Sequence, residues 1–311
     1  MKKVLVAGAS GLIGGHLVKR LLADGHQVRA VGRRSLPEWR QLHPAAENLQ
    51  LDLRKKENCY RAVEGMDEVY NLAADIGGAR YIESKKAELM LSVLINTHLL
   101  MAARDLGVKR YFYSSAYAVS AADHEPAGVL GDGHIWEKLF SEKLCQYFRE
   151  DFGIQTRVAR LQNVYGPYET YGGDRERATS AMCRKAIEAR RSGNHEFEIW
   201  GDGTQERNFL YVDDALDGII KLLPSDITEP VALGSSEFIT INQLVDIVEG
   251  IAGIKFERRY NLSAPVGTPR RPGPPPGHPR LDWQSKISLR EGMTRLYRWM
   301  EQDMERKLVK V

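Results

Sequence analysis

Short apolar runs alternate with longer amphipathic stretches through the first half of the chain. The runs have the length of buried strands, and the stretches between them place apolar residues at helical spacing. This alternation predicts a parallel sheet with right-handed helical crossovers. The expected strands are Lys3–Ala7, Gln27–Val31, Leu49–Asp52, Glu68–Leu72, Arg110–Ser114 and Gln155–Arg160, and the main helices are Leu12–Asp24, Glu88–Leu106 and His134–Phe152.

The pattern changes after about residue 165, where turn residues become frequent and loops lengthen. Helical segments follow at 179–191, 212–223, 241–251 and 288–307. The stretch Pro265–Pro279 holds seven of the 13 prolines, which excludes a regular helix or a central strand there. We therefore predict an α/β fold with a Rossmann-like doubly wound parallel sheet over residues 1–165, joined by later segments. A smaller C-terminal substrate-binding lobe is expected mainly over residues 166–311.

Composition narrows the class of protein further. The chain has 311 residues, with 44 Lys and Arg against 41 Asp and Glu, and this near-balance does not suggest a nucleic-acid-binding protein. No apolar run reaches about 18 residues, so no membrane span is expected. The sequence Met1-Lys2-Lys3 leads straight into the first strand, which argues against a signal peptide. Three cysteines without metal-ligand spacing predict a cytoplasmic protein with no metal site.

The most informative motif is the glycine-rich turn between the first strand and the first helix. Glycines there let the backbone approach a phosphate closely, and the free amides of the first helical turn point at the anion. The preceding strand and the following helix make this turn a dinucleotide site rather than a plain turn. The residues assigned to the cofactor at this turn are Gly8, Ser10, Gly11, Leu12, Ile13 and Gly14.

The end of the second strand indicates which dinucleotide binds. An NAD site carries an acidic residue about 20 residues after the glycines, where it bonds a ribose hydroxyl. Here Arg33 and Arg34 stand in that region, and guanidinium groups suit a 2′-phosphate, so NADP is favoured over NAD. Further cofactor contacts are expected at the ends of the third and fourth strands, from Asp52, Leu53, Leu72, Ala73 and Ala74.

Together these features resemble the extended short-chain dehydrogenase/reductase family, which comprises nucleotide-sugar epimerases, dehydratases and reductases. The resemblance covers almost the whole chain. Besides the glycine turn, it is carried by Asn96, by Ser114-Ser115, by residues 160–167 (RLQNVYGP) and by residues 200–209 (WGDGTQERNF). The resemblance implies a cofactor role for Asn96 and a nucleotide-sugar substrate, and it implies a homodimer built on the helices near 88–106 and 134–152.

Within this family the likeness is strongest to the 3,5-epimerases that act on GDP-mannose. Residues 71–78 (NLAADIGG), 171–178 (YGGDRERA) and 183–186 (CRKA) carry it. A GDP-sugar is therefore the favoured substrate. The residues expected to hold it are Gly77, Gly78, Asn163, Lys185, Trp200, Arg207 and one of Arg270 or Arg271, with Arg271 preferred.

The family's working set is a Ser or Thr together with a Tyr four residues before a Lys on one helix. Ser115 and Lys138 match this set, and Lys138 is also expected to bind the nicotinamide ribose. The position four before Lys138 is His134 rather than tyrosine. An imidazole exchanges protons near neutral pH, so His134 can replace the phenol. The alternatives are that Tyr117 supplies the phenol, or that the redox step is lost.

Two more positions depart from the 3,5-epimerase pattern. Tyr117 stands where those enzymes have a cysteine acid/base, and Arg177 stands where they have a lysine. Arginine keeps its proton at ordinary pH, so Arg177 suits an electrostatic anchor better than an acid. Tyr117 can still act as an acid/base, and substrate positioning is the alternative role for both.

Three hypotheses about function follow. The first is an NAD(P)-dependent epimerase that oxidises C4, allows inversion at C3 or C5, and reduces C4 again. The second is a 4-ketoreductase or C4 epimerase with the same nucleotide-sugar site. The third is a catalytically silent protein that binds NADP or a nucleotide sugar.

Overall fold

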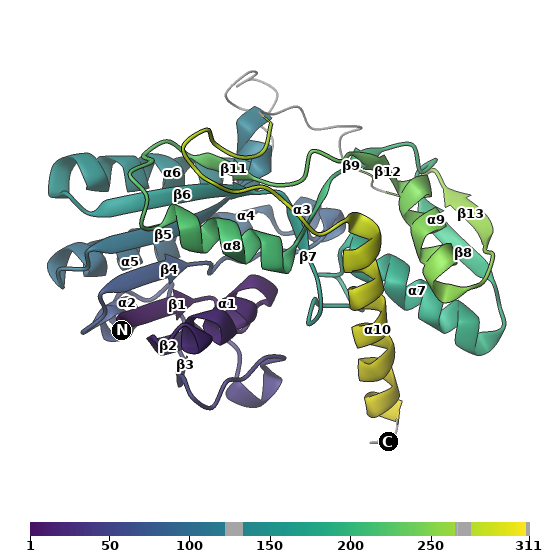
Figure 1. Ribbon diagram of the computed structural model, residues 1–311, viewed down its shortest axis with the longest axis horizontal. Coiled ribbons are helices and arrows are strands. Elements are labelled where there is room, and N and C mark those ends of the chain that lie inside the picture. Colours follow the sequence, from purple (N-terminus) through teal and green to yellow (C-terminus); the bar gives the residue numbers. More distant parts are fainter. Residues whose placement is uncertain (122–132, 265, 267–274, 309–311) are drawn as a thin grey trace.

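The computed structural model describes residues 1–121, 133–264, 266 and 275–308. Its centre is a seven-stranded sheet with the order β11-β6-β5-β4-β1-β2-β3 (Figure 1). Every neighbouring pair in this sheet is parallel. The strands are β1 Lys3–Ala7, β2 Gln27–Gly32, β3 Glu47–Gln50, β4 Glu68–Asn71, β5 Arg110–Ala116, β6 Gln155–Leu161 and β11 Val231–Leu233. The order reverses between β1 and β4, which is the arrangement of a doubly wound Rossmann-like sheet.

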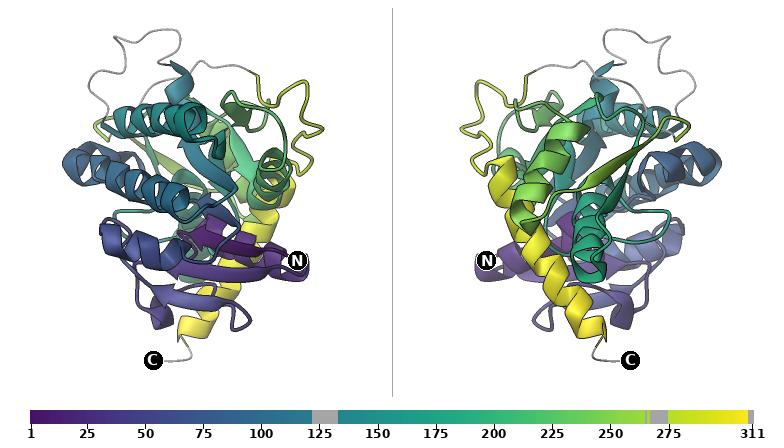
Figure 2. Two further views of the ribbon diagram at one scale, coloured as in Figure 1. Left: turned by 90° about the vertical axis from the view of Figure 1, so that its left-hand side faces the viewer. Right: turned by 90° about the vertical axis from the view of Figure 1, so that its right-hand side faces the viewer.

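Helices cover both faces of the sheet, so the domain has three layers (Figure 2). One face carries α2 (Lys56–Val63), α5 (Ser92–Asp105) and α6 (Gly133–Phe152), and the other carries α1 (Leu12–Ala23) and α8 (Val212–Leu222). A strand that is covered on both faces is largely apolar, and β1 shows this most clearly. In β1, the residues Val4, Leu5, Val6 and Ala7 are all fully buried.

The second lobe contains α7 (Ala178–Ser192), α9 (Ile241–Ala252) and three two-stranded sheets. The pairs are β8 (Glu196–Trp200) with β13 (Glu257–Asn261), β9 (Glu206–Arg207) with β12 (Ile239–Thr240), and β7 (Asn163–Tyr165) with β10 (Phe209–Tyr211). Helix α10 (Leu289–Leu308) packs against α7 and α9.

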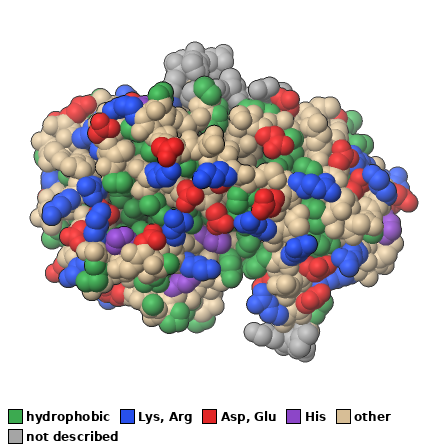
Figure 3. Space-filling view, viewed as in Figure 1, with side chains coloured by type: hydrophobic (Ala, Val, Ile, Leu, Met, Phe, Trp, Pro, Cys, Tyr) green, Lys and Arg blue, Asp and Glu red, His purple; other side chains and the backbone are tan. Residues whose placement is uncertain are grey.

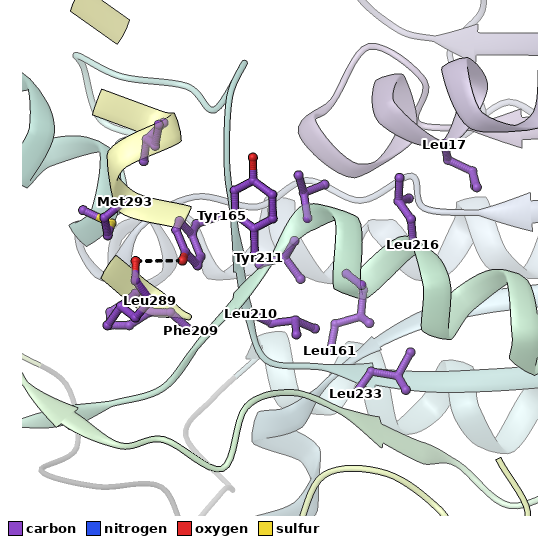
Figure 4. Close-up of a cluster of buried hydrophobic side chains, with 14 of the residues drawn as sticks. Leu17, Leu161, Tyr165, Phe209, Leu210, Tyr211, Leu216, Leu233, Leu289 and Met293 are labelled. Atoms are coloured by element: carbon purple, nitrogen blue, oxygen red, sulfur yellow. Dashed lines mark hydrogen bonds between the residues drawn. The ribbon is translucent and has the colours of Figure 1, made fainter. Parts of the chain in front are cut away.

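A continuous apolar core joins this lobe to the sheet (Figure 4). Leu17 of α1, Leu161 of β6 and Leu216 of α8 belong to the same cluster as Met293 of α10. The hydroxyl of Tyr165 donates a hydrogen bond to the main-chain oxygen of Leu289, at 3.3 Å. The segment from β7 to α10 is therefore packed firmly beside the carboxyl edge of the sheet.

The predicted fold class is confirmed, and all six predicted strands lie in the sheet. Two element boundaries were wrong. The third strand is Glu47–Gln50, because its pairing with β2 ends at Gly32 and the chain then turns away. The helix predicted at 88–106 is divided into α4 (Lys86–Met90) and α5, since the amide of Leu94 bonds Leu91 three residues back. The pattern of apolar and polar positions did not predict α2, the short helix α3 (Ala79–Ser84) or the strands from β7 onward.

The surface and the helices add two observations. Acidic and basic side chains are interspersed over the face drawn in Figure 3. Among the helices in the described part of the chain, none combines the length and the apolar character that a membrane crossing requires.

Candidate dinucleotide and sugar site

A cavity of about 310 Å³ lies at the carboxyl ends of β1 to β4, where the strand order reverses. Ligands bind at this point in doubly wound sheets. Its wall contains these residues predicted for the cofactor: Gly8, Ser10, Gly11, Leu12, Ile13, Gly14, Arg33, Arg34, Asp52, Leu53, Leu72, Ala73 and Ala74. The structure thus brings these four separate segments of the chain to one cavity.

The glycine turn has no room for a side chain at Gly8 or Gly14. Gly8 has a φ of 86°, and a Cβ there would lie 2.8 Å from the backbone of Leu72 and Ala73. A Cβ on Gly14 would overlap the carbonyl oxygen of Gly8. The first residue of α1 follows Gly11, which caps the helix without a side chain, so the first amides of α1 stay open to an anion.

The rim of the cavity is rich in arginine. Arg33, Arg34, Arg40 and Arg175 all line it. Partial burial lowers the pKa of Arg34, and the neighbouring charges of Arg175 and Arg40 lower it further. Guanidinium groups gathered in this way create a positive potential that favours an anion.

Two carboxylates on the same wall are already paired. Asp52 forms an ion pair with Arg54 at 2.6 Å, and the hydrogen bonds from Arg54 lower the pKa of Asp52. Asp75 lies 2.5 Å from Arg175 and 3.8 Å from Arg33. Asp75 is therefore paired more closely with Arg175 than with Arg33.

Arg175 fastens the loop before α7 to the end of β4. Its guanidinium donates to the main-chain oxygen of Ile76 at 2.9 Å and to the hydroxyl of Tyr81 at 2.5 Å. It also lies over the Tyr81 ring, 4.1 Å from the centroid. Beside this contact, a Cβ on Gly78 would overlap the main-chain oxygen of Glu176. The two stretches 71–78 and 171–178, singled out from the sequence, therefore meet in space.

Lys138 lies in a buried polar network beneath β5. Its ammonium donates to the hydroxyl of Tyr113 and to the main-chain oxygen of Ser114, both at 3.1 Å. The Tyr113 hydroxyl in turn donates to Glu137 at 2.9 Å, and Glu137 lies 3.4 Å from the ammonium. Burial holds the pKa of Tyr113 well above its usual value, and the Glu137 carboxylate adds to this effect.

Ser115 belongs to a second buried network. Its hydroxyl donates to the carboxylate of Glu142, which also accepts from Arg160 at 2.8 and 3.0 Å. All three residues are at most 8% exposed. Because its proton is directed at Glu142, the Ser115 oxygen offers lone pairs rather than a proton to a ligand.

The remaining predicted catalytic and cofactor residues lie at different depths. Tyr117 and His134 are buried, and Arg177 is part of the cavity wall. Asn96 is buried below the cavity, where its side-chain oxygen accepts hydrogen bonds from Tyr111 at 2.9 Å and from Asn71 at 3.1 Å.

The predicted substrate residues do not form one cluster around this cavity. Asn163 donates to the main-chain oxygen of Asn208 at 2.8 Å, and Arg207 donates to that of Val266 at 2.6 Å. Lys185 donates to the main-chain oxygen of Glu198 at 2.7 Å. The structure also describes three further predicted substrate residues, Gly77, Gly78 and Trp200. The predicted Arg270 and Arg271 lie outside the described residues.

Sequence reasoning missed several polar residues of this region. They are Asp75, Glu137, Glu142, Glu169 and Arg175. Asp75 and Arg175 stand inside the stretches that carried the resemblance, which is a signal that could have marked them. The partners of Glu137 and Glu142 are distant in sequence, and no periodicity points to them.

The glycine turn, the parallel sheet and the cavity at its switch point define a dinucleotide-binding protein of the Rossmann class. Comparison with known proteins narrows this class. Residues 4–233 match the model of the NAD dependent epimerase/dehydratase family, and the chain belongs to this family.

Three relatives indicate the range of similar proteins. GDP-mannose 3,5-epimerase from Arabidopsis thaliana is 33% identical, with 99% of this chain and 84% of that protein aligned. A dTDP-4-dehydro-6-deoxy-D-allose reductase from Streptomyces bikiniensis is 30% identical, with 87% of each aligned. The structure of UDP-glucose 4-epimerase from Thermotoga maritima shares the fold, with a TM-score of 0.85, 23% identity, and 97% and 99% of the two chains covered. The resemblance to extended short-chain dehydrogenases/reductases is thereby confirmed.

Proposed function

We propose that this protein is an NAD(P)-dependent epimerase of a GDP-mannose-like nucleotide sugar, acting through a transient 4-keto sugar. The observation that carries the proposal is the 33% identity to the Arabidopsis enzyme over nearly the whole chain. The glycine turn and the arginine rim fit a dinucleotide by their chemistry. When bound, the nicotinamide supplies hydride removal and return at the sugar's C4.

The polar residues around α6 hold the reacting part of the sugar in this proposal. His134 and Lys138 are one helical turn apart and both buried, so they face the same region. His134 exchanges the proton of the sugar's 4-hydroxyl, a role that suits imidazole near neutral pH. Lys138 supplies positive charge beside the nicotinamide ribose, and Ser115 accepts a hydrogen bond from the sugar.

Tyr117 and Arg177 serve the carbons beside the ketone. Tyr117 exchanges the proton at C3 or C5, and Arg177 anchors the sugar and stabilises negative charge on the keto oxygen. Asn163, Lys185, Trp200, Arg207 and Arg271, with Gly77 and Gly78, hold the remainder of the nucleotide sugar. Residues 1–165 thus serve mainly the dinucleotide, and residues 166–311 serve mainly the substrate.

The arginine rim supports NADP as the preferred cofactor. Arg33 and Arg34 follow β2, where the 2′-position of the adenine ribose lies in this class of fold. Two carboxylates of the cavity wall, Asp52 and Asp75, are paired with arginines. A 2′-phosphate would therefore meet positive charge there rather than an uncompensated carboxylate.

We also propose a cytoplasmic homodimer that uses the outer face of α6. Trp136, Phe140 and Tyr147 repeat at helical spacing on this helix and are 42%, 52% and 52% exposed. Large apolar side chains in such a stripe favour a partner helix. Light scattering of the wild type and of Phe140→Asp tests this, with a dimer expected for the first and a monomer for the second.

Proton exchange beside the ketone is the decisive test of the epimerase. The purified protein is incubated with GDP-mannose and NAD or NADP in deuterium oxide, and the sugar is followed by NMR. Deuterium at C3 or C5 supports the proposal. Absence of exchange in a protein that binds both ligands contradicts it for this sugar.

A 4-ketoreductase is the second candidate, because a relative with that activity is 30% identical over 87% of the chain. A reductase differs from the epimerase because it oxidises one NADPH for each 4-keto sugar that it reduces. Net oxidation of NADPH without deuterium at C3 or C5 identifies it.

A further inference from the structure

The segment 167–177, between β7 and α7, supplies one wall of the dinucleotide cavity. Its members in that wall are Tyr168, Glu169, Thr170, Arg175 and Arg177. Every other residue of the wall lies within residues 8–95, in the half of the chain that carries the glycine turn. The cavity is therefore formed where two parts of the chain that are far apart in sequence meet.

The start of this segment is tied to the dinucleotide half of the protein. His16 of α1 donates from Nε2 to the main-chain oxygen of Pro167 at 3.0 Å, and its ring lies edge-on to the ring of Tyr168, with centroids 5.6 Å apart. Arg40 donates to the main-chain oxygen of Glu169 at 3.1 Å. Tyr168 has a φ of 70°, and such a conformation persists in a bulky residue only where surrounding contacts fix it. The segment is thus fastened beside the helix that begins at the glycine turn.

The end of the segment is held at the carboxyl end of β4 by Arg175. Its guanidinium pairs with Asp75 at 2.5 Å and donates to the hydroxyl of Tyr81, which in turn donates to Asp75 at 3.1 Å. The side chains of Asp75 and Arg175 are 12% and 31% exposed, so water screens their attraction less than that of a surface pair. Both residues line the cavity. The two walls of the cavity therefore touch at this ion pair.

We propose that the segment 167–177 is a strap over the dinucleotide cavity and that Arg175 is a positioning residue, whose ion pair with Asp75 keeps the strap closed and retains the dinucleotide. A ligand that fills the cavity is enclosed by both walls, and its release requires the Asp75–Arg175 contact to open. Asp75 already neutralises Arg175, so Arg175 acts through the strap rather than as a free charge. Slow release suits an epimerase, because its cofactor returns to the starting state in each cycle. This inference rests on the proposed dinucleotide site.

The rate of dinucleotide release tests the inference. NADPH and NADH are each bound to the protein and displaced by an excess of NADP or NAD in a stopped-flow fluorimeter. Arg175→Gln and Asp75→Asn are each expected to raise the dissociation rate constant about tenfold with little change in the association rate constant. The double variant should release the dinucleotide no faster than the single variants, since both changes break the same contact. Arg175→Lys keeps the charge and should release it more slowly than Arg175→Gln.

Arg258→Gln is the matched control. Arg258 also pairs with a carboxylate at 2.5 Å, that of Asp246, but this pair ties β13 to α9 in the second lobe. Its loss should lower the free energy of unfolding and leave the release of NADPH unchanged.

Three results would overturn the inference and leave the dinucleotide site intact. Unchanged release in Arg175→Gln, with a lowered free energy of unfolding as in Arg258→Gln, would show that the ion pair serves only the fold. Slower association alone would show that Arg175 attracts the dinucleotide by its charge. Slower release in Asp75→Asn would show that the freed Arg175 holds a phosphate. A wild type that binds neither NADPH nor NADH contradicts the proposed function and the strap together.

Discussion

The ammonium group of Lys138 lies 3.1 Å from the hydroxyl of Tyr113, which stands 25 residues earlier in the chain. The same hydroxyl donates to Glu137, so one phenol links the lysine to a buried carboxylate. The network fixes the direction of the Lys138 side chain before any ligand arrives. Preorganised charge of this kind is more effective than charge that must be oriented on binding.

Tyr113→Phe tests this network. The change removes one acceptor for Lys138 and one donor to Glu137, and we expect a loss of about 1–3 kcal/mol in the free energy of unfolding. Activity should fall further than cofactor affinity, because Lys138 is no longer held in place. Urea denaturation and steady-state kinetics measure the two effects. Tyr70→Phe, a buried tyrosine on the neighbouring strand β4, should leave activity near that of the wild type.

Glu142→Gln tests the network around Ser115. The change removes the carboxylate opposite Arg160 in a buried place, and a loss of about 3 kcal/mol in the free energy of unfolding is expected. Glu150→Gln on the same helix removes an exposed carboxylate and should cost well under 1 kcal/mol. Equal denaturation midpoints for the two variants would show that the buried pair does not stabilise the fold.

Gly14→Ala tests the phosphate-binding turn. A Cβ at this position overlaps the carbonyl oxygen of Gly8, so the turn must shift and dinucleotide binding should be lost. Gly250→Ala is the control, since Gly250 is also helical and its new Cβ would meet only the flexible end of Arg290, at 3.1 Å. Fluorescence titration with NADPH distinguishes the two variants, and unchanged binding in Gly14→Ala would contradict the position of the site.

Arg33→Ala tests the cofactor preference. Loss of a charge-assisted contact to a 2′-phosphate is expected to raise the Kd for NADP by roughly 10- to 100-fold. The Kd for NAD should change by less than about threefold, because NAD lacks that phosphate. Arg61→Ala, an exposed arginine on α2 away from the cavity, controls for net charge. A parallel weakening of both cofactors would place Arg33 at the diphosphate instead.

Glu169 also predicts a pH dependence of stability. Its pKa is about 7 in the folded protein and near 4.5 when unfolded, so the folded state keeps the proton over this range and the unfolded state releases it. Stability contributed by the neutral form is complete below about pH 4.5 and is lost as pH rises to about 7. Relative to the wild type, Glu169→Gln should therefore gain about 3 kcal/mol in free energy of unfolding between these pH values. Denaturation series at both pH values check this, and a constant difference would show that Glu169 ionises normally.

The sequence by itself determined the alternating α/β architecture, the approximate positions of the first six strands along the chain, and the glycine turn. These features depend on local spacing, because a buried parallel strand is a short, largely apolar run and a close backbone approach requires glycine. The departures at Tyr117, His134 and Arg177 were visible because the sequence could be set against the pattern of the family that it resembles.

Only the tertiary structure decided which side chains share a cavity and which are already paired. Arg175 reaches Asp75, Lys138 reaches Tyr113, and Arg160 reaches Glu142 across distant segments. The spacing of apolar residues along the chain does not predict such side-chain pairs. They form where the crossover connections bring strand ends and loops together in space. Glu169 shows this most clearly. A glutamate is expected at the surface from its residue type alone, whereas here it is buried against α7, and burial raises its pKa to about 7.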